Sequence, residues 1–285
     1  MQIGFIGLGS IGLPMAINLN KSGFNLKVHT RSRINESHSG LEGCKTCSNP
    51  YEVAKGVDIL IVCVTDDKAV DDVLFGEYGA LSALKNRAVV IDFSTISFLS
   101  SLKFYKKLKT KNILYVDSPV TGGTEAAKSA SLTVFVGGNQ NDLKFINSVY
   151  KCIGGSIFYF ERVGNGQKVK ALNQILVAGA FASLAEALAL GQKFDLPMDK
   201  VVKSLTTGAG SSWALEHRAL SMLNGNYPLG FKLELHQKDL KIALETSSDV
   251  GLQMPITEAV FNIEQELIKL GYGDEDVSCI RRFNK

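Results

Sequence analysis

A glycine motif near the start of the chain has the spacing of a nucleotide-binding turn. It follows a short apolar run, residues 3–6, and consists of Gly7, Leu8, Gly9, Ser10, Ile11 and Gly12. Between a strand and a helix, the first glycine permits a tight turn, the second lets backbone approach a pyrophosphate, and the third lets helix and strand pack closely. The amino end of the helix then faces the anion. The motif predicts a dinucleotide site; the alternative is a glycine-rich turn without a ligand.

The residues after the second predicted strand indicate which dinucleotide is bound. An NAD site usually ends this strand with an acidic residue that accepts hydrogen bonds from the ribose 2′-hydroxyl. Here the strand is followed by Thr30, Arg31 and Ser32, and the first acid, Glu36, comes too late for that role. An arginine flanked by hydroxyls suits a 2′-phosphate. We expect NADP(H) to be preferred, with NAD(H) possible; the alternative is that Arg31 only caps a loop.

A second pair of glycines has the pattern of a carboxylate site. Gly122 and Gly123 follow Thr121 just after a predicted strand. Successive exposed backbone N–H groups in such a turn can form a nest for an anion. The alternative is a purely structural turn.

Short apolar runs alternate with helical patterns through the first 160 residues. We expect strands at residues 2–6, 25–29, 58–64, 88–92, 114–116, 132–136 and 156–159. Helical patterns lie between most of them, for example at 97–109 and 140–153. This alternation predicts an α/β fold, with an N-terminal Rossmann-type, doubly wound, mostly parallel sheet that forms a dinucleotide-binding domain over residues 1–163.

The pattern changes near Gly164, after which no convincing strand follows. A helix predicted over residues 166–194 is apolar on nearly all sides, so it must be buried on all sides. In a small domain this burial is more easily achieved against a second subunit. We therefore predict an all-helical substrate and dimerisation domain over residues 164–285, joined to the first by a long interdomain helix, in a homodimer or homotetramer.

Composition narrows the class of protein. The chain has 285 residues, of which 45% are hydrophobic and 21% charged, as in ordinary globular proteins. A net charge of +3 is too small to imply nucleic acid as a partner. The first predicted strand leaves no room for a signal peptide, and the apolar run 175–190 is shorter than the roughly 20 residues of a membrane span. We expect a cytoplasmic protein with no membrane partner.

The five cysteines are an odd number without a disulfide framework, which is typical of a reduced compartment. Cys44 and Cys47 have a CxxC spacing, but no second pair and no histidine pair accompanies them. Zinc sites need such partners, so we expect no metal.

Four stretches of the chain resemble the β-hydroxyacid dehydrogenases. This 6-phosphogluconate dehydrogenase-like family includes 3-hydroxyisobutyrate dehydrogenase, tartronate semialdehyde reductase and the glyoxylate/succinic semialdehyde reductases. The stretches are GFIGLGSIG at 4–12, DSPVTGG at 117–123, GNGQKVK at 164–170 with Asn173 following, and KDL at 238–240 with Ala243 and Leu244 following. They occur in the family's order over nearly the whole chain. The resemblance implies an NAD(P)-dependent oxidoreductase acting on a small hydroxyacid or aldehyde.

The resemblance assigns Lys170 as the general acid/base. One group with a pKa near neutrality can protonate an alkoxide and, in reverse, deprotonate a hydroxyl. A lysine can serve if burial lowers its pKa from about 10.4, and Lys170 begins the most apolar helix. Lys168 should point elsewhere, whereas Asn173 shares the Lys170 face at i+3. Some relatives carry the Asn at i+4, where this chain has Gln174, so either residue fills that role.

The resemblance also implies contacts in the first domain. Thr121, Gly122 and Gly123 would bind the substrate acid group, and Thr95 would contact the nicotinamide end of the cofactor and the substrate. Val64 and Thr65 end a strand at the same sheet edge, where ligands of open α/β sheets gather. The family often has Gly where Ala130 stands, which suggests a small local difference in the backbone.

In the second domain, the resemblance implies that Lys238 contacts the cofactor, Asp239 orients the site and Phe231 lines the substrate pocket. Phe231 and the residues after the second strand favour the glyoxylate/succinic semialdehyde reductases. The pair Asn173 and Gln174 resembles tartronate semialdehyde reductase. Trp213 fits either a family element or ordinary core.

The sequence therefore predicts reversible hydride transfer between NADPH and a small aldehyde bearing a carboxylate, with reduction as the working direction. The enzyme alternatives are 3-hydroxyisobutyrate dehydrogenase, tartronate semialdehyde reductase and, less well matched because it typically lacks the lysine, an imine reductase. Alternatives of another class are a non-catalytic dinucleotide-binding module and a methyltransferase.

Overall fold

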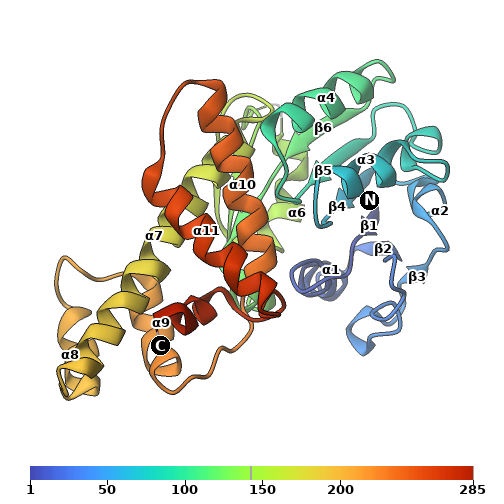
Figure 1. Cartoon of the computed structure of the whole chain (residues 1–285). Coiled ribbons are helices and arrows are strands. Elements are labelled where there is room, and N and C mark those ends of the chain that lie inside the picture. The colour runs from blue at the N-terminus through green and yellow to red at the C-terminus, as the bar shows by residue number, and fades with distance from the viewer. Residues whose placement is uncertain (142, 285) are drawn as a thin grey trace. The chain divides into compact units, whose positions relative to one another are not determined.

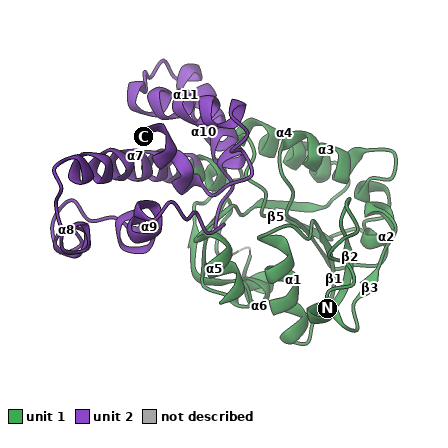
Figure 2. Ribbon diagram, turned by 60° about the horizontal axis from the view of Figure 1, so that its bottom comes forward, with its two compact units in different colours: residues 1–170 green, residues 171–285 purple. Residues whose placement is uncertain are grey.

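The computed structural model describes residues 1–141 and 143–284, which form two compact units. Unit 1 comprises residues 1–170 and unit 2 residues 171–285 (Figure 2). The helix α7, Asn165–Lys193, begins in unit 1 and continues into unit 2.

Unit 1 is built on a six-stranded parallel sheet in the order β3-β2-β1-β4-β5-β6 (Figure 1). The strands are β1 (Gln2–Ile6), β2 (Asn25–His29), β3 (Lys45–Thr46), β4 (Ile59–Val62), β5 (Val89–Asp92) and β6 (Leu114–Asp117). The chain leaves β1 for β2 on one side and reaches β4 on the other, so the strand order reverses there. The predicted Rossmann-type sheet is confirmed, and its reversal point lies at the glycine motif.

Helices cover both faces of this sheet. The first apolar core packs α1 (Gly12–Lys21) and α5 (Gly123–Lys128) against one face. The second core packs α2 (Pro50–Ala54), α3 (Asp67–Phe75) and α4 (Phe98–Lys109) against the other. Burial on both faces explains why the central strands are continuous apolar runs.

A second sheet has the order β7-β8-β9. Its strands are β7 (Val120–Thr121), β8 (Leu132–Val136) and β9 (Gly154–Tyr159), with β7 antiparallel and β9 parallel to β8. The strands predicted at 132–136 and 156–159 therefore belong to a separate sheet. The two-residue strands β3 and β7 are too short to leave a pattern and were not predicted.

Other segments of unit 1 are short. The helix predicted over 140–153 is a 3-10 turn, η3 (Lys144–Ile146), followed by α6 (Asn147–Lys151), and residue 142 lies outside the described residues. Two further 3-10 turns are η1 (Ser39–Leu41) and η2 (Ala80–Ser82).

The regular elements of unit 2 are all helical in its described residues, as predicted. After α7 come α8 (Met198–Leu205), α9 (Trp213–Leu223), α10 (Leu233–Asp249), α11 (Pro255–Lys269) and the 3-10 segment η4 (Val277–Asn284). Leu188, Leu215, Leu233, Leu240 and Leu267 belong to its core.

The helix α7 is partly exposed in the single chain. Leu172, Leu176 and Leu190 are 61%, 74% and 56% exposed. By length and composition the helix is apolar enough to cross a membrane, so the expectation that its apolar run is too short is wrong. Core helices of soluble proteins pass the same test. The chain alone therefore does not bury this helix on all sides.

Candidate active site

The glycine motif has the geometry of a nucleotide-binding turn. A Cβ on Gly7 would lie 2.1 Å from the carbonyl oxygen of Cys63, and one on Gly12 would lie 1.9 Å from that of Gly7. These two glycines are therefore required by close packing of strand, turn and helix. A Cβ on Gly9 would meet nothing within 4 Å, which leaves open the space that a pyrophosphate would use. Helix α1 follows without a side-chain cap at Ile11, so the motif fits a dinucleotide.

Glu36 returns to the carboxyl end of β2, contrary to the expectation that it comes too late in the chain. Its carboxylate is buried and accepts a hydrogen bond from the backbone N–H of Thr30 at 2.9 Å. Its other oxygen lies 2.8 Å from Nε of Arg33. The turns between Thr30 and Glu36 bring the carboxylate back to the strand end, and the sequence alone does not reveal them. Both oxygens of Glu36 are thus engaged within the protein.

The two arginines of this loop differ in their surroundings. Arg33 pairs with Glu36 and also donates to the carbonyl oxygens of Cys47 and Ser48, both at 3.3 Å. Arg31 and Ser32 are exposed. The positive charge available to a ligand at the end of β2 is therefore that of Arg31.

Asp117, the first residue of the stretch at 117–123, is hydrogen-bonded to the stretch at 164–170. This buried residue ends β6, and its carboxylate accepts hydrogen bonds from the backbone N–H groups of Gly164 at 2.7 Å and Gln167 at 3.0 Å. A Cβ on Gly166 would lie 2.8 Å from the same carboxylate. Burial raises the pKa of Asp117 to about 6, although the backbone donors oppose the shift. Asp117 therefore fixes the start of α7 at the carboxyl end of the sheet.

Asp92 organises the neighbouring strand end, and it is aligned with Asp117 in the sheet register. Its carboxylate accepts from the backbone N–H of Ser94 at 2.9 Å and from the Tyr115 hydroxyl at 2.8 Å. The Ser94 hydroxyl accepts from the backbone N–H of Val64 at 3.0 Å. Burial raises the pKa of Asp92 to about 6. The loops after β4 and β5 are thus fixed to each other.

Several predicted residues lie on these two loops. The loop after β4 includes Val64 and Thr65, whose hydroxyl donates to Asp66 at 3.0 Å. Thr95 follows Ser94 and is partly buried. These residues gather at the carboxyl edge of the sheet, as expected.

Lys170 and Lys168 differ as the helical period predicts. Lys170 is 6% exposed, whereas Lys168 is exposed and its Nζ lies 4.8 Å from the centroid of the Phe98 ring. Lys170 is therefore the desolvated lysine of the pair.

The second glycine pair lies in a turn that favours glycine at both positions. Gly122 and Gly123 have φ values of 122° and 68°, and Thr121 pairs with Thr133 in the second sheet. Positive φ values of this kind are adopted readily by glycine and rarely by other residues. Ala130, nearby, has a φ of 55°. Alanine here adopts the left-handed conformation that favours glycine.

Unit 2 holds a chain of polar side chains. The Asn173 amide donates to Oε1 of Gln174 at 2.8 Å, and the Gln174 amide donates to Asp239 at 2.7 Å. Nζ of Lys238 lies 2.8 Å from the other Asp239 oxygen. Gln174 and Asp239 are buried. Four predicted residues of α7 and α10 are thus brought together.

Unit 2 also contains a buried pair of ionisable side chains, His236 and Glu264. Nδ1 of His236 lies 2.6 Å from Glu264, and both side chains are fully buried. Burial lowers the pKa of His236, but the Glu264 carboxylate more than offsets this, so that the pKa is raised. The Phe231 ring packs edge-on against His236, with the two ring centroids 5.7 Å apart. The backbone N–H of Phe231 donates to Asp276 at 2.9 Å.

Sequence reasoning missed Asp92, Asp117 and Gln167 as parts of the site. Each aspartate ends an apolar strand, and Asp117 opens the second resembling stretch. These positions could be seen in the sequence, but the hydrogen-bond partners of the two aspartates lie far away along the chain. Trp213 is 50% exposed and stacks on His217, so it is not core.

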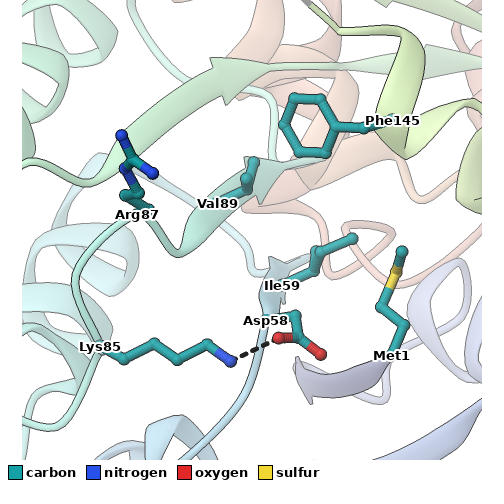
Figure 3. Close-up of a pocket in the computed structure, with 7 residues that line it drawn as sticks. All are labelled: Met1, Asp58, Ile59, Lys85, Arg87, Val89 and Phe145. Atoms are coloured by element: carbon teal, nitrogen blue, oxygen red, sulfur yellow. Dashed lines mark hydrogen bonds and ion pairs between the residues drawn. The ribbon is translucent and has the colours of Figure 1, made fainter.

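A pocket of unit 1 lies at the amino ends of the sheet strands, opposite to the carboxyl ends where a dinucleotide would bind. It has a volume of about 270 Å³, and Lys85 forms an ion pair with Asp58 in its wall (Figure 3). Its lining residues are Met1, Asp58, Ile59, Lys85, Arg87, Val89 and Phe145. Ile59 and Val89 begin their strands, whereas ligands of such sheets bind at the carboxyl ends.

Comparison with known proteins agrees with the geometry. Residues 2–161 match the NAD binding domain of 6-phosphogluconate dehydrogenase, and residues 164–283 match a family described as NAD-binding of NADP-dependent 3-hydroxyisobutyrate dehydrogenase. The chain is 35% identical to 2-(hydroxymethyl)glutarate dehydrogenase of Eubacterium barkeri, over 98% of this chain and 93% of the relative. It is 29% identical to glyoxylate/succinic semialdehyde reductase 1 of Arabidopsis thaliana, over 98% and 97%.

Among solved structures, the 3-hydroxyisobutyrate dehydrogenase of Mycobacterium tuberculosis with L-serine aligns with a TM-score of 0.89 and 25% identity, over 99% of this chain and 98% of that one. The predicted family is confirmed, although the identities do not single out the glyoxylate reductase branch. The chain belongs to the 3-hydroxyisobutyrate dehydrogenase-like β-hydroxyacid dehydrogenases, and it is an oxidoreductase that acts on the CH–OH group of small hydroxyacids with NAD(P).

Proposed function

We propose that this enzyme uses NADPH to reduce a small aldehyde bearing a carboxylate, such as succinic semialdehyde or glyoxylate, with Lys170 as general acid/base. The observation that carries the proposal is the burial of Lys170 at 6% exposure, in a helix whose first turn is bonded to Asp117. Desolvation favours the neutral form of a lysine, which suits proton transfer near neutral pH.

Other residues of unit 1 would bind the cofactor and the substrate. When bound, the nicotinamide supplies or accepts the hydride. The glycine motif would hold the pyrophosphate, and Thr95, Val64 and Thr65 the nicotinamide end. Thr121, Gly122 and Gly123 would bind the substrate carboxylate through hydroxyl and backbone N–H groups. Lys170 would then donate a proton to the developing alkoxide, and would take it back in the oxidation direction.

The preference for NADP(H) rests on the loop after β2. The Glu36 carboxylate is buried and already contacts Thr30 and Arg33, which disfavours it as the acidic residue of an NAD site. Arg31 is exposed between two hydroxyl residues and presents the donors that a 2′-phosphate requires. NAD(H) would bind without that phosphate contact and therefore more weakly.

Unit 2 carries further residues to which we assign roles. We assign residues 1–163 to a dinucleotide-binding domain and residues 164–285 to a substrate and dimerisation domain. Asn173 would face the substrate oxygen, because Gln174 is buried against Asp239. Lys238 would contact the cofactor, and Phe231 would line the substrate pocket.

A second candidate substrate class is a hydroxymethyl dicarboxylate. The 35% identity to 2-(hydroxymethyl)glutarate dehydrogenase favours it, because such a substrate carries the same carboxylate and primary alcohol with one more acid group. The 3-hydroxyisobutyrate and tartronate semialdehyde activities stay as alternatives. A module without activity would show nucleotide binding and no turnover.

We also propose a cytoplasmic homodimer or homotetramer. The exposed leucines of α7 support the assembly, since an apolar helix face is stable in water only when another surface covers it. Light scattering tests the proposed assembly, and a monomer would contradict it.

The acid/base role is tested by comparing two lysines of the same helix. Lys170→Ala should lower kcat by about 100- to 10,000-fold, the usual contribution of a general acid/base. Lys168→Ala is the matched control, because Lys168 is exposed and should leave kcat unchanged. Near-normal turnover of Lys170→Ala would overturn the assignment.

A further inference from the structure

The side-chain amide of Gln167 forms a bracket around Thr95. Its Nε2 donates to the carbonyl oxygen of Ser94 at 2.7 Å, and its Oε1 accepts from the backbone N–H of Ile96 at 3.2 Å. These two backbone groups flank Thr95 on either side. Gln167 is 3% exposed, so both bonds are shielded from water.

The backbone of Gln167 is fixed as well. Its N–H donates to the Asp117 carboxylate, which holds the first turn of α7 at the end of β6. Lys170 follows at i+3, on the same side of the helix. The loop after β5 and the turn that carries Lys170 are therefore connected through one side chain.

We infer that Gln167 is a positioning residue that sets the spacing between the Thr95 loop and Lys170. The inference rests on the proposed function, in which Thr95 contacts the nicotinamide end and Lys170 transfers the proton. Hydride transfer and proton transfer must meet at one carbonyl group, and a displacement of about 1 Å can lower the rate about a hundredfold. Gln167 acts through these residues and needs no contact with the substrate.

An amide suits this position because it must donate and accept at once. Methionine has a similar length but makes neither bond. Glutamate keeps the acceptor for Ile96 and, when ionised, loses the donor to Ser94. The methionine variant therefore removes both hydrogen bonds and the glutamate variant removes one, with little change in side-chain shape.

The experiment compares Gln167→Met and Gln167→Glu with Gln192→Met, a control on the same helix. Gln192 is exposed and accepts a hydrogen bond from Arg281 at 2.6 Å in unit 2. Each variant is measured for kcat, KM, thermal stability and the deuterium isotope effect with NADPH labelled at the transferred position. Hydrogen exchange at the Ile96 amide of the free protein gives a readout that does not depend on turnover.

Gln167→Met should lower kcat by about 10- to 100-fold with KM within about twofold, raise the isotope effect and speed exchange at Ile96. Gln167→Glu should show the same changes to a smaller extent, and it decides the question if the methionine variant does not fold. Gln192→Met should match the wild type.

Wild-type kcat and isotope effect in a folded Gln167 variant, even with lower thermal stability, would overturn the inference and leave Gln167 a structural residue. Failure of the proposed function gives a different result. In that case the wild type oxidises a hydroxyacid but reduces no aldehyde with NADPH, and the same variants are then compared in the oxidation assay.

Discussion

Asp92 and Asp117 in unit 1 and Asp239 and Glu264 in unit 2 are buried carboxyl groups with different kinds of partner. In unit 1, Asp92 and Asp117 meet backbone N–H groups and a tyrosine hydroxyl, and burial raises the pKa of each to about 6. In unit 2, Asp239 lies beside Lys238 and Glu264 beside His236. The first arrangement fixes backbone around strand ends, and the second pairs charges between side chains. The two units should therefore respond differently to mutation and to pH.

The largest effect should come from breaking the buried pair of unit 2. His236→Leu leaves the Glu264 carboxylate buried without its partner, which should lower the free energy of unfolding by about 3 to 5 kcal/mol. Urea unfolding followed by the fluorescence of Trp213, the only tryptophan, measures it.

The double variant with Glu264→Leu should recover most of this loss, because a buried pair replaced by apolar groups is often neutral. If the single and double variants were equally destabilised, the pair would not be the cause.

A smaller effect should follow from Asp117→Ala in unit 1. The buried N–H groups of Gly164 and Gln167 lose their acceptor, which should lower the free energy of unfolding by about 2 to 3 kcal/mol. Hydrogen exchange at these two amides should also accelerate. Unchanged protection at Gly164 and Gln167 would refute the role given to Asp117.

The pH dependence should separate the two units. Asp92 and Asp117 have raised pKa values in the folded state, so their contribution to stability is present below about pH 4 and is lost as the pH rises through about 6. The pKa of His236 is raised, so its contribution is present below about 6.5 and is lost above that, as the pH passes the raised value.

Asp92→Asn should reduce the pH slope of unit 1 by up to about 1.4 kcal/mol per pH unit between pH 4 and 6. Hydrogen exchange of β5 and β6 reports on unit 1, and Trp213 fluorescence on unit 2. One common pH window for both reporters would contradict the comparison.

The smallest effect should be a gain in stability. Ala130→Gly relieves the left-handed conformation at φ 55° and should raise the free energy of unfolding by about 0.5 to 1 kcal/mol. Ser129→Gly, next to it with φ −87°, is the control and should bring no gain. Thermal unfolding distinguishes the two variants.

Much of the molecule could be predicted from the sequence because its patterns are local. The bounds of β1, β2 and β8 were predicted to the residue, since β1 and β8 are short runs rich in apolar residues and β2 alternates polar and apolar residues. The gathering of Val64, Thr65 and Thr95 at one edge follows from the parallel order of their strands.

What could not be predicted depends on partners far apart in the chain. The bracket of Gln167 around Thr95 and the cap of Asp117 on α7 join distant segments, and no local pattern marks them. The return of Glu36 depends on a loop without regular structure.

The most direct test of the account is the initial rate of NADPH oxidation, with NADH in parallel, by the wild type and by Arg31→Ala. The aldehydes are succinic semialdehyde, glyoxylate, tartronate semialdehyde and methylmalonate semialdehyde. The account predicts turnover with NADPH and one of the first two, and a loss of the NADPH preference by about 10- to 100-fold in the variant, as expected for charged hydrogen bonds to a phosphate. No turnover with any aldehyde despite NADPH binding, or equal rates with NADH, would contradict it.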